Sequence, residues 1–270
     1  MYILICTVTV LVVCKVYLIF IWKWKKNNQP FYRKAEELII GHRGSPTFIT
    51  ENTIYSFQKA LDQGVDGIEL DIRLCGDGKI VIFHDADLIR LAERPEKIIE
   101  LSFAELKKIP LKKRAEQKKE AFIPTLDDII PLLKRIQVLN IEIKSEKFYE
   151  NRDILTPLVE FIEKNSIQNK CIVSSFNPYL LFQLKKRHPK IILGFLYSSY
   201  KSLLYNLVWM FVCRPDNLHI NYKEINYPLH WWARRKGLRI NAYTVNDCET
   251  YHNLQGKIDG VFTDNIEYLK

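Results

Sequence analysis

The amino-acid sequence predicts an α/β fold in which eight parallel strands close into a barrel surrounded by helices. The chain has 270 residues, 47% of them hydrophobic and 26% charged, which is typical of a folded domain and not of a disordered chain. Strand-like runs alternate with helical patterns, an order that indicates parallel strands joined by helical crossovers. The length agrees, because α/β barrels reach about 200–250 residues without dividing into separate domains.

The first 26 residues are predicted to form a transmembrane anchor, followed by a linker over residues 27–37. Tyr2–Trp22 is apolar except for Lys15 and two threonines, and a helix of this length spans about 31 Å, close to the ~30 Å hydrocarbon core of a bilayer. A cleaved signal peptide is the alternative, although the segment has no basic start and no small-residue cleavage site. Lysines follow the segment, so the positive-inside rule predicts a single-pass membrane protein whose folded domain is cytoplasmic.

Residues 38–270 are predicted to form the barrel domain. The strand-like runs are short, apolar and bounded by polar residues or glycine. They are Leu38–Gly41, Gly67–Leu74, Lys79–Phe83, Val138–Ile143, Cys171–Ser175, Ile191–Leu196, Asn217–Ile220, Arg239–Val245 and Asp259–Thr263. Apolar residues recur with helical spacing in six segments between them. These segments are Tyr55–Gln63, Thr125–Arg135, Leu155–Lys164, Pro178–Arg187, His230–Lys236 and Cys248–Leu254.

Nine strands are one more than the barrel needs, and the third run explains the excess. Only Cys75-Gly76-Asp77-Gly78 separates Leu74 from Lys79, whereas a parallel crossover needs a dozen or more residues. These two runs must therefore form an antiparallel hairpin with a glycine-rich turn. The hairpin is an excursion after the second strand, and the remaining eight strands make a (β/α)8 barrel of the TIM type.

The hairpin also returns a histidine to the second strand. If its turn centres on Gly76-Asp77, Glu69 pairs with His84 and Asp71 with Ile82, within a slip of about one residue. His84 then lies near the level of Glu69, at the carboxyl end of the barrel strands. Catalytic groups of such barrels lie at that end, and His42 follows the first strand on the same side.

Three carboxylates occupy the ends of otherwise apolar strands. Glu69 and Asp71 are two positions apart and share one strand face, and Glu142 lies one residue before the end of the fourth run. Clustered carboxylates repel each other unless a hard cation lies between them. Ligands that offer only oxygen atoms favour Ca²⁺ or Mg²⁺ over zinc.

Two histidines and two cations accompany these carboxylates. His42 and His84 can act as a general acid and base, and Arg43 and Lys144 can hold a phosphate. Taken alone, Glu142 with Lys144 would fit a plain salt bridge equally well. The whole set at one end of the barrel points to a site for a phosphate ester and a divalent cation.

From about Leu38 to the end of the chain, a series of short motifs resembles the glycerophosphodiester phosphodiesterase family (GP-PDE domain). They are "GHRG", "ENT", "DGIELDIRL", "DGKIVIFHD", "IPTLDD", "NIEIK", "VSSF", "AYTVN" and "DGVFTD", in the order of the family. The resemblance implies that His42 and His84 are the catalytic pair and that Arg43 and Lys144 bind the substrate phosphate. It also implies that Ca²⁺ or Mg²⁺ binds to Glu69, Asp71 and Glu142. In the family, a hydroxyl of the substrate glycerol can attack phosphorus and give a cyclic phosphate, which water then opens.

The implied activity is hydrolysis of glycerophosphodiesters to sn-glycerol 3-phosphate and an alcohol, or of lysophospholipids by a lysophospholipase D reaction. The alternatives are phospholipid cleavage of the sphingomyelinase D or phospholipase C kind, and a catalytically silent, membrane-bound binding protein. The silent protein would have lost a histidine or a carboxylate, and none is missing. The formal charge of +9 favours anionic partners. Nucleic acid is not expected among them, because the positive charge is dispersed and no binding motif occurs.

Five further residues are expected to line the pocket or to support it: Glu51, Asn52, Ser175, Phe176 and Tyr243. Asn52 is expected to cap the next helix, and Glu51 to orient His42 or the metal ligands. Tyr243 stands where the family commonly has tryptophan, which leaves the preference for the leaving group open.

Two segments allow two interpretations each. The basic stretch 106–120 is either a solvated loop or a contact with anionic headgroups. The apolar stretch 203–212 is either a buried crossover helix or a membrane-dipping lid.

Overall fold

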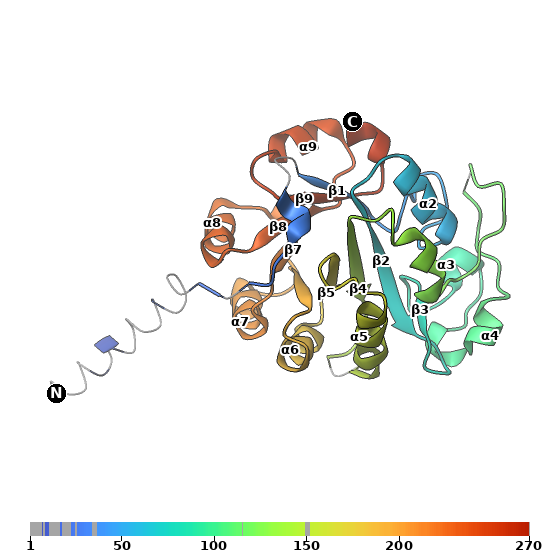
Figure 1. Cartoon of the computed structure of the whole chain (residues 1–270), viewed down its shortest axis with the longest axis horizontal. Helices are drawn as coiled ribbons and strands as arrows, with labels where there is room; N and C mark the ends of the chain where they lie inside the picture. Colours follow the sequence, from blue (N-terminus) through green and yellow to red (C-terminus); the bar gives the residue numbers. More distant parts are fainter. Residues whose placement is uncertain are drawn as a thin grey trace.

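The computed structural model describes residues 23–24, 26–33, 37–114, 116–148 and 152–269, together with positions 7, 9, 10 and 17. The strands described are β1 (Leu38–Gly41), β2 (Gly67–Leu74), β3 (Ile80–Ile82), β4 (Val138–Ile143), β5 (Cys171–Ser175), β6 (Ile192–Leu196), β7 (Asn217–Asn221), β8 (Arg239–Tyr243) and β9 (Gly260–Thr263). They form one sheet in the order β1-β9-β8-β7-β6-β5-β4-β2-β3, and β1 also pairs with β2. All of these strands except β3 are parallel to their neighbours, so the sheet closes into the predicted eight-stranded barrel (Figure 1).

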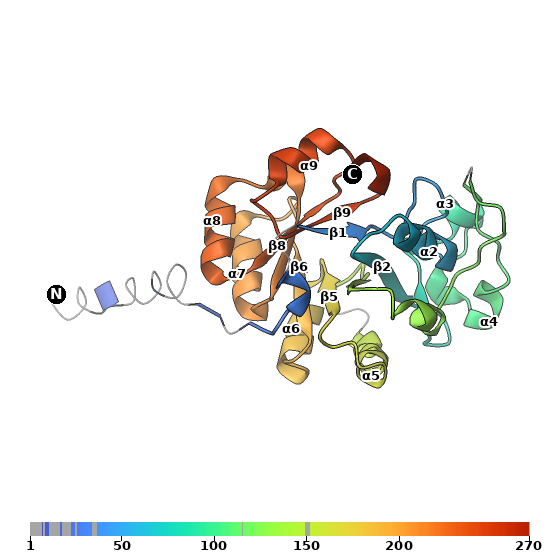
Figure 2. The same cartoon turned by 45° about the horizontal axis from the view of Figure 1, so that its top comes forward.

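Helices cover the outside of this barrel (Figures 1 and 2). Those described are α2 (Ile54–Asp62), α3 (Ile89–Ala92), α4 (Phe103–Leu106), α5 (Leu155–Lys164), α6 (Pro178–Arg187), α7 (Leu203–Cys213), α8 (Tyr227–Lys236) and α9 (Cys248–Leu254). The helix predicted over Thr125–Arg135 is instead a 3₁₀ segment, η4 (Asp127–Leu132). Its Pro131 has no N–H to donate to a longer helix.

The interior of the barrel is apolar near the amino ends of the strands and charged near their carboxyl ends. Every second residue of a barrel strand points inward. Near the amino ends of the strands these inward residues form an apolar cluster that includes Leu38, Val138, Ile192 and Phe262. The aromatic rings of η2 (Pro30–Arg33) belong to the same cluster and close this end of the barrel. The charged inward residues, which include Glu69, Asp71 and Glu142, lie towards the opposite, carboxyl end.

The predicted hairpin is present, with a register shifted by one residue. β3 runs antiparallel to β2 and pairs Ile72 with Ile82, whereas the expected partner of Ile82 was Asp71. The reason is the turn, which centres on Asp77: the Cys75 N–H donates to the Lys79 carbonyl oxygen at 3.0 Å. An odd number of residues in the loop moves the register by one position, within the slip that the sequence allowed.

The N-terminal prediction needs a correction. No helix in the described part of the chain is long and apolar enough to cross a membrane, and this finding contradicts the predicted single-pass membrane protein. Tyr2–Trp22, on which that prediction rested, lies outside the described residues except at four positions. Trp24, within the first 26 residues that were predicted to form the anchor, is buried against the barrel. Its ring meets Trp232 of α8 edge-to-face at 5.8 Å.

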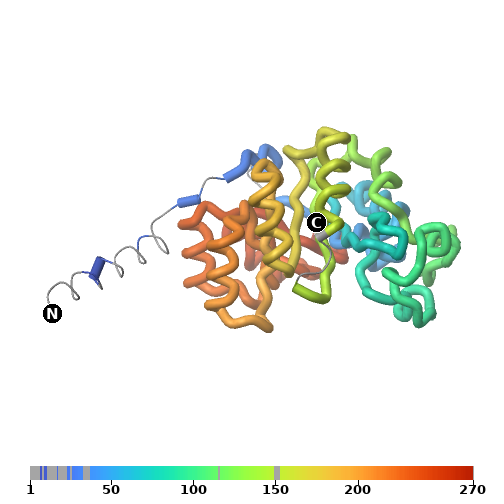
Figure 3. Tube along the Cα trace, turned by 90° about the horizontal axis from the view of Figure 1, so that it is seen from below, coloured from blue at the N-terminus to red at the C-terminus, as the bar shows by residue number. Residues whose placement is uncertain are grey.

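The structure shows the form of the two segments that allowed two interpretations each. The apolar stretch forms α7, a crossover helix that packs beside α6 and buries Asn206, Met210 and Cys213 (Figure 3). Its other face, which includes Leu204 and Val208, is exposed. The basic stretch is an irregular and mostly exposed loop over its described residues, which is compatible with both interpretations.

Candidate active site

The turn after β1 presents His42 and Arg43 at the mouth of the barrel. Arg43 has a φ of +56° and Gly44 a φ of +90°, so the chain reverses through left-handed conformations that are costly for a non-glycine residue. The first residues of α2 hold this turn, because Ser56 Oγ donates to the Arg43 carbonyl oxygen at 3.0 Å. The Arg43 N–H in turn donates to Glu69 Oε2 at 2.8 Å.

Glu69, Asp71 and Glu142 meet as a buried cluster of carboxylates. An oxygen of each lies within 4.8 Å of the others, and their residues are at most 7% exposed. Burial, and then repulsion by Asp71 and Glu142, raises the pKa of Glu69 well above its usual value. The Glu69 Oε1 atom is buried and has no hydrogen-bond partner among the described residues.

Two cations balance part of this negative charge. Lys144 Nζ lies 2.9 Å from Asp71 Oδ1 and also pairs with Glu142. Arg43 Nε lies 3.2 Å from Asp71 Oδ2. Burial alone would raise the pKa of Asp71, but Lys144 and Arg43 outweigh it and lower that pKa. Asp71 is thus compensated, while Glu69 is not.

This imbalance fits a hard divalent cation. Ca²⁺ and Mg²⁺ bind to oxygen atoms, and converging carboxylates whose negative charge is only partly balanced are typical ligands of these ions. Such an ion would be a partner for Glu69 Oε1, which has no hydrogen-bond partner among the described residues. The cluster predicted from strand alternation therefore has both the composition and the spacing of a metal site.

Each of the two histidines is held by an aspartate. His42 Nδ1 lies 2.7 Å from Asp264 Oδ1, just after β9, and His84 Nδ1 lies 2.6 Å from Asp85 Oδ1. With Nδ1 engaged, the other ring nitrogen of each histidine is left for the cavity that both residues line. Sequence reasoning missed these two aspartates, although Asp264 ends the "FTD" motif and Asp85 the "FHD" motif.

A chain of ion pairs joins the two sides of the site. Arg90 of α3 donates to Asp85 Oδ2 at 2.7 Å and to both oxygens of Glu51. Glu51 also accepts from Arg43 Nη1 at 2.8 Å. Glu51 therefore orients Arg43, whereas the sequence predicted that it would orient His42 or the metal ligands. Arg90 is a further member of the site that sequence reasoning missed.

Of the other residues predicted to line or support the pocket, two line the cavity and two lie behind it. Asn52 is not a helix cap: Thr53 caps α2, and the Asn52 amide donates to Asp71 Oδ2 at 2.7 Å. Ser175 lies under the rim, where its Oγ donates to the Ile143 carbonyl oxygen. Phe176 and Tyr243 line the cavity, and their rings meet at 6.4 Å.

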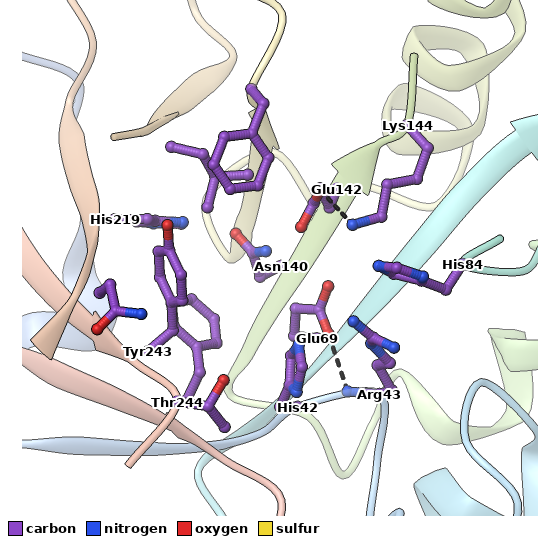
Figure 4. A pocket seen from close by; sticks show the side chains of 14 residues that line it. His42, Arg43, Glu69, His84, Asn140, Glu142, Lys144, His219, Tyr243 and Thr244 are labelled. Carbon is purple, nitrogen blue, oxygen red and sulfur yellow. Dashed lines mark hydrogen bonds and ion pairs between the residues drawn. The ribbon is translucent and has the colours of Figure 1, made fainter. Parts of the chain in front are cut away.

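A cavity of about 260 Å³ opens at this end of the barrel. His42, Arg43, Glu69, His84, Glu142 and Lys144 line its charged side (Figure 4). Asn140 of β4 and His219 of β7 line the rest together with aromatic and aliphatic side chains. Both were missed from the sequence, although Asn140 alternates with Glu142 on β4 and His219 alternates with Asn217 and Asn221 on β7.

Comparison with known proteins identifies the family. Residues 42–268 match the glycerophosphoryl diester phosphodiesterase family over nearly the whole barrel. The chain belongs to this family. A glycerophosphodiester phosphodiesterase of Caldanaerobacter subterraneus subsp. tengcongensis is 32% identical over 240 residues, which cover 86% of this chain and 96% of that protein.

Solved structures agree with this glycerophosphoryl diester phosphodiesterase assignment. A phosphodiesterase of Oleispira antarctica in complex with the product sn-glycerol-3-phosphate has a TM-score of 0.77 and 29% identity, and the match covers 87% of this chain and 95% of that one. A glycerophosphodiester phosphodiesterase of Thermotoga maritima has a TM-score of 0.69 and 31% identity, with coverage of 87% and 97%. The predicted family, barrel fold and enzyme class, a phosphoric diester hydrolase, are confirmed.

Proposed function

We propose that this protein hydrolyses glycerophosphodiesters to sn-glycerol 3-phosphate and an alcohol, with His42 and His84 as the acid and base. One observation carries the proposal. Two imidazoles, each held at Nδ1 by an aspartate, line the same cavity as two cations and two carboxylates of the buried cluster, Glu69 and Glu142. This set supplies proton transfer and phosphate binding within one pocket.

Each group has a role that follows from its chemistry. Arg43 and Lys144 bind the phosphate oxygens, because both are cationic and reach the cavity. One imidazole accepts the proton of the glycerol hydroxyl that attacks phosphorus, and the other donates a proton to the oxygen of the leaving alcohol. The cyclic phosphate formed in this step is opened by water with the two proton transfers reversed, which gives sn-glycerol 3-phosphate. Asp264 and Asp85 keep the rings in the orientation and tautomer that these transfers need.

Glu69, Asp71 and Glu142 are proposed to hold a divalent cation, Ca²⁺ or Mg²⁺. A bound cation would stabilise negative charge on the phosphoryl oxygens. The support is the uncompensated charge of Glu69 and the convergence of oxygen ligands.

A lysophospholipid is a second candidate substrate. Its support is the neutral side of the cavity, where Leu196, Phe176 and Tyr243 form an apolar wall. Phe176 is 46% exposed, so the wall continues to the surface and an acyl chain could follow it. A lysophospholipase D reaction would then use the same charged groups.

Product analysis separates the two substrates. The protein is incubated with glycerophosphocholine, glycerophosphoethanolamine, glycerophosphoinositol or lysophosphatidylcholine, each with Ca²⁺ or Mg²⁺, and the products are identified by mass spectrometry. We expect sn-glycerol 3-phosphate from the first three. Lysophosphatidic acid from the last would establish lysophospholipase D activity, and no product from any of them would contradict the proposal.

Asp264→Asn is expected to lower kcat roughly 10- to 10³-fold with KM changed by less than about threefold. The amide can donate to Nδ1 of His42, which favours the wrong tautomer, while substrate contacts persist. Steady-state kinetics on glycerophosphocholine measures the effect. The matched control is Asp247→Asn, since Asp247 only caps α9. Equal kcat values for the two variants would remove Asp264 from the mechanism.

A further inference from the structure

The cavity has a neutral end that the proposed chemistry does not use. Figure 4 shows His219 and Tyr243 on the side opposite His84 and Lys144, with Asn140 between His219 and Glu69. All of these residues line the cavity. A phosphodiester whose phosphate lies among the charged groups must place one of its two substituents in this neutral end.

His219 is an unusual residue for such a position. It is completely buried, its ring points toward the cavity (Figure 4), and neither ring nitrogen has a hydrogen-bond partner among the described residues. Burial lowers its pKa to about 3, so the ring is neutral at pH 7 and offers one donor and one acceptor. Gly194 of β6 makes room for it, because a Cβ there would lie 2.6 Å from Cε1 of the ring.

Asn140 completes the neutral end. Its Nδ2 donates to Ser174 Oγ at 3.0 Å, which orients the amide, while its buried Oδ1 has no hydrogen-bond partner in the described part of the chain. Unpartnered buried polar atoms destabilise a fold. The pair presents neutral donors and acceptors, which complement a hydroxyl group and give no specific attraction to an ionic headgroup.

We propose that His219 and Asn140 bind the terminal hydroxyl of the substrate glycerol and thereby select glycerophosphodiesters from other phosphodiesters. The inference rests on the proposed function, which positions the phosphate. Leu196 and Phe262 flank this end of the cavity and contact the glycerol carbons. His219 is a specificity-determining residue in this arrangement and takes no part in proton transfer.

The test compares glycerophosphocholine with its 1-deoxy analogue, which lacks only the terminal hydroxyl and keeps the hydroxyl next to the phosphate-bearing carbon. We expect the native protein to prefer glycerophosphocholine by about tenfold or more in kcat/KM. His219→Leu should reduce this preference to within about twofold, mainly by losing activity on glycerophosphocholine. His219→Gln, which keeps a donor and an acceptor, should retain part of the preference.

Asn217→Leu is the matched control. Asn217 lies two residues earlier on β7, is also buried with both amide atoms unpartnered among the described residues, and is not part of the cavity lining. Both leucine variants should unfold at the native temperature or up to about 4 °C higher, since each removes unpartnered polar atoms. Only His219→Leu should change the substrate preference.

The outcomes separate this inference from the proposed function. A native protein that hydrolyses neither substrate overturns the proposed function and the inference with it. A native protein that hydrolyses both equally well overturns the inference alone, and this comparison needs no variant. A folded His219→Leu protein that keeps the native preference also overturns the inference.

Discussion

His84→Ala and His42→Ala are each expected to lower kcat by roughly 10²–10⁴-fold, the usual contribution of a general acid or base. The fold should survive both changes, because the two side chains lie at the rim and are 31% and 19% exposed. KM should change little, since Arg43 and Lys144 still bind the phosphate. Turnover of glycerophosphocholine and a thermal melt of each variant measure the two effects.

The control for the histidine prediction is His188→Ala. His188 follows α6 on the outside of the barrel and is not part of the cavity lining, so its loss should leave kcat unchanged. A His84→Ala or His42→Ala variant with near-native turnover would exclude that histidine from proton transfer.

Glu69→Gln is expected to weaken binding of the divalent cation and to lower activity at limiting metal by roughly 10- to 100-fold or more, with partial recovery at high metal concentration. Asp71→Asn and Glu142→Gln should act in the same direction. Chelation with EDTA should abolish the activity of the native protein. The affinity of each of the three variants for the cation is measured from its activity as a function of metal concentration.

Glu69→Gln also has a distinctive effect on stability. Without metal, Glu69 is repelled by two neighbouring carboxylates, so its neutral replacement should unfold at a higher temperature than the native protein. Addition of Ca²⁺ or Mg²⁺ should then raise the midpoint of the native protein but hardly that of the variant. Glu146→Gln is the control, because Glu146 pairs with Arg73 outside the cluster. An unchanged metal response in all three cluster variants would refute the metal site.

Most of the barrel could be predicted from the sequence. Each barrel strand is a short apolar run, and polar residues begin near its carboxyl end. Glu69 and Asp71 could be placed on one face from their spacing alone, and a turn of only four residues required β3 to be antiparallel. The convergence of Glu142 with them needed only the rule that parallel strands end at the same side of a barrel.

The other features of the site depend on contacts between residues far apart in the sequence, which a local sequence pattern cannot predict. Asp264 reaches His42 only because β9 lies beside β1, and Arg90 reaches Glu51 only because the loop after β3 folds over the rim. Asn52 was mistaken for a cap because the position before a helix favours asparagine, whereas its positive φ directs the amide to Asp71. The N-terminal prediction used hydropathy, length and flanking charge, none of which shows that Trp24 packs against α8.

The pairing of β1 with β9 has a consequence for how the protein is made. His42 and Asp264 are 222 positions apart, and β1 lies between β2 and β9 in the closed barrel. At synthesis rates of about 5–20 residues per second, a nascent chain exposes one edge of β1 for roughly 10–45 s before its partner strand exists. During that interval the growing chain depends on chaperones or on transient collapse to avoid aggregation. His42 acquires Asp264 only when the ribosome has delivered β9, so the proposed catalytic pair and the closed barrel form in the same step.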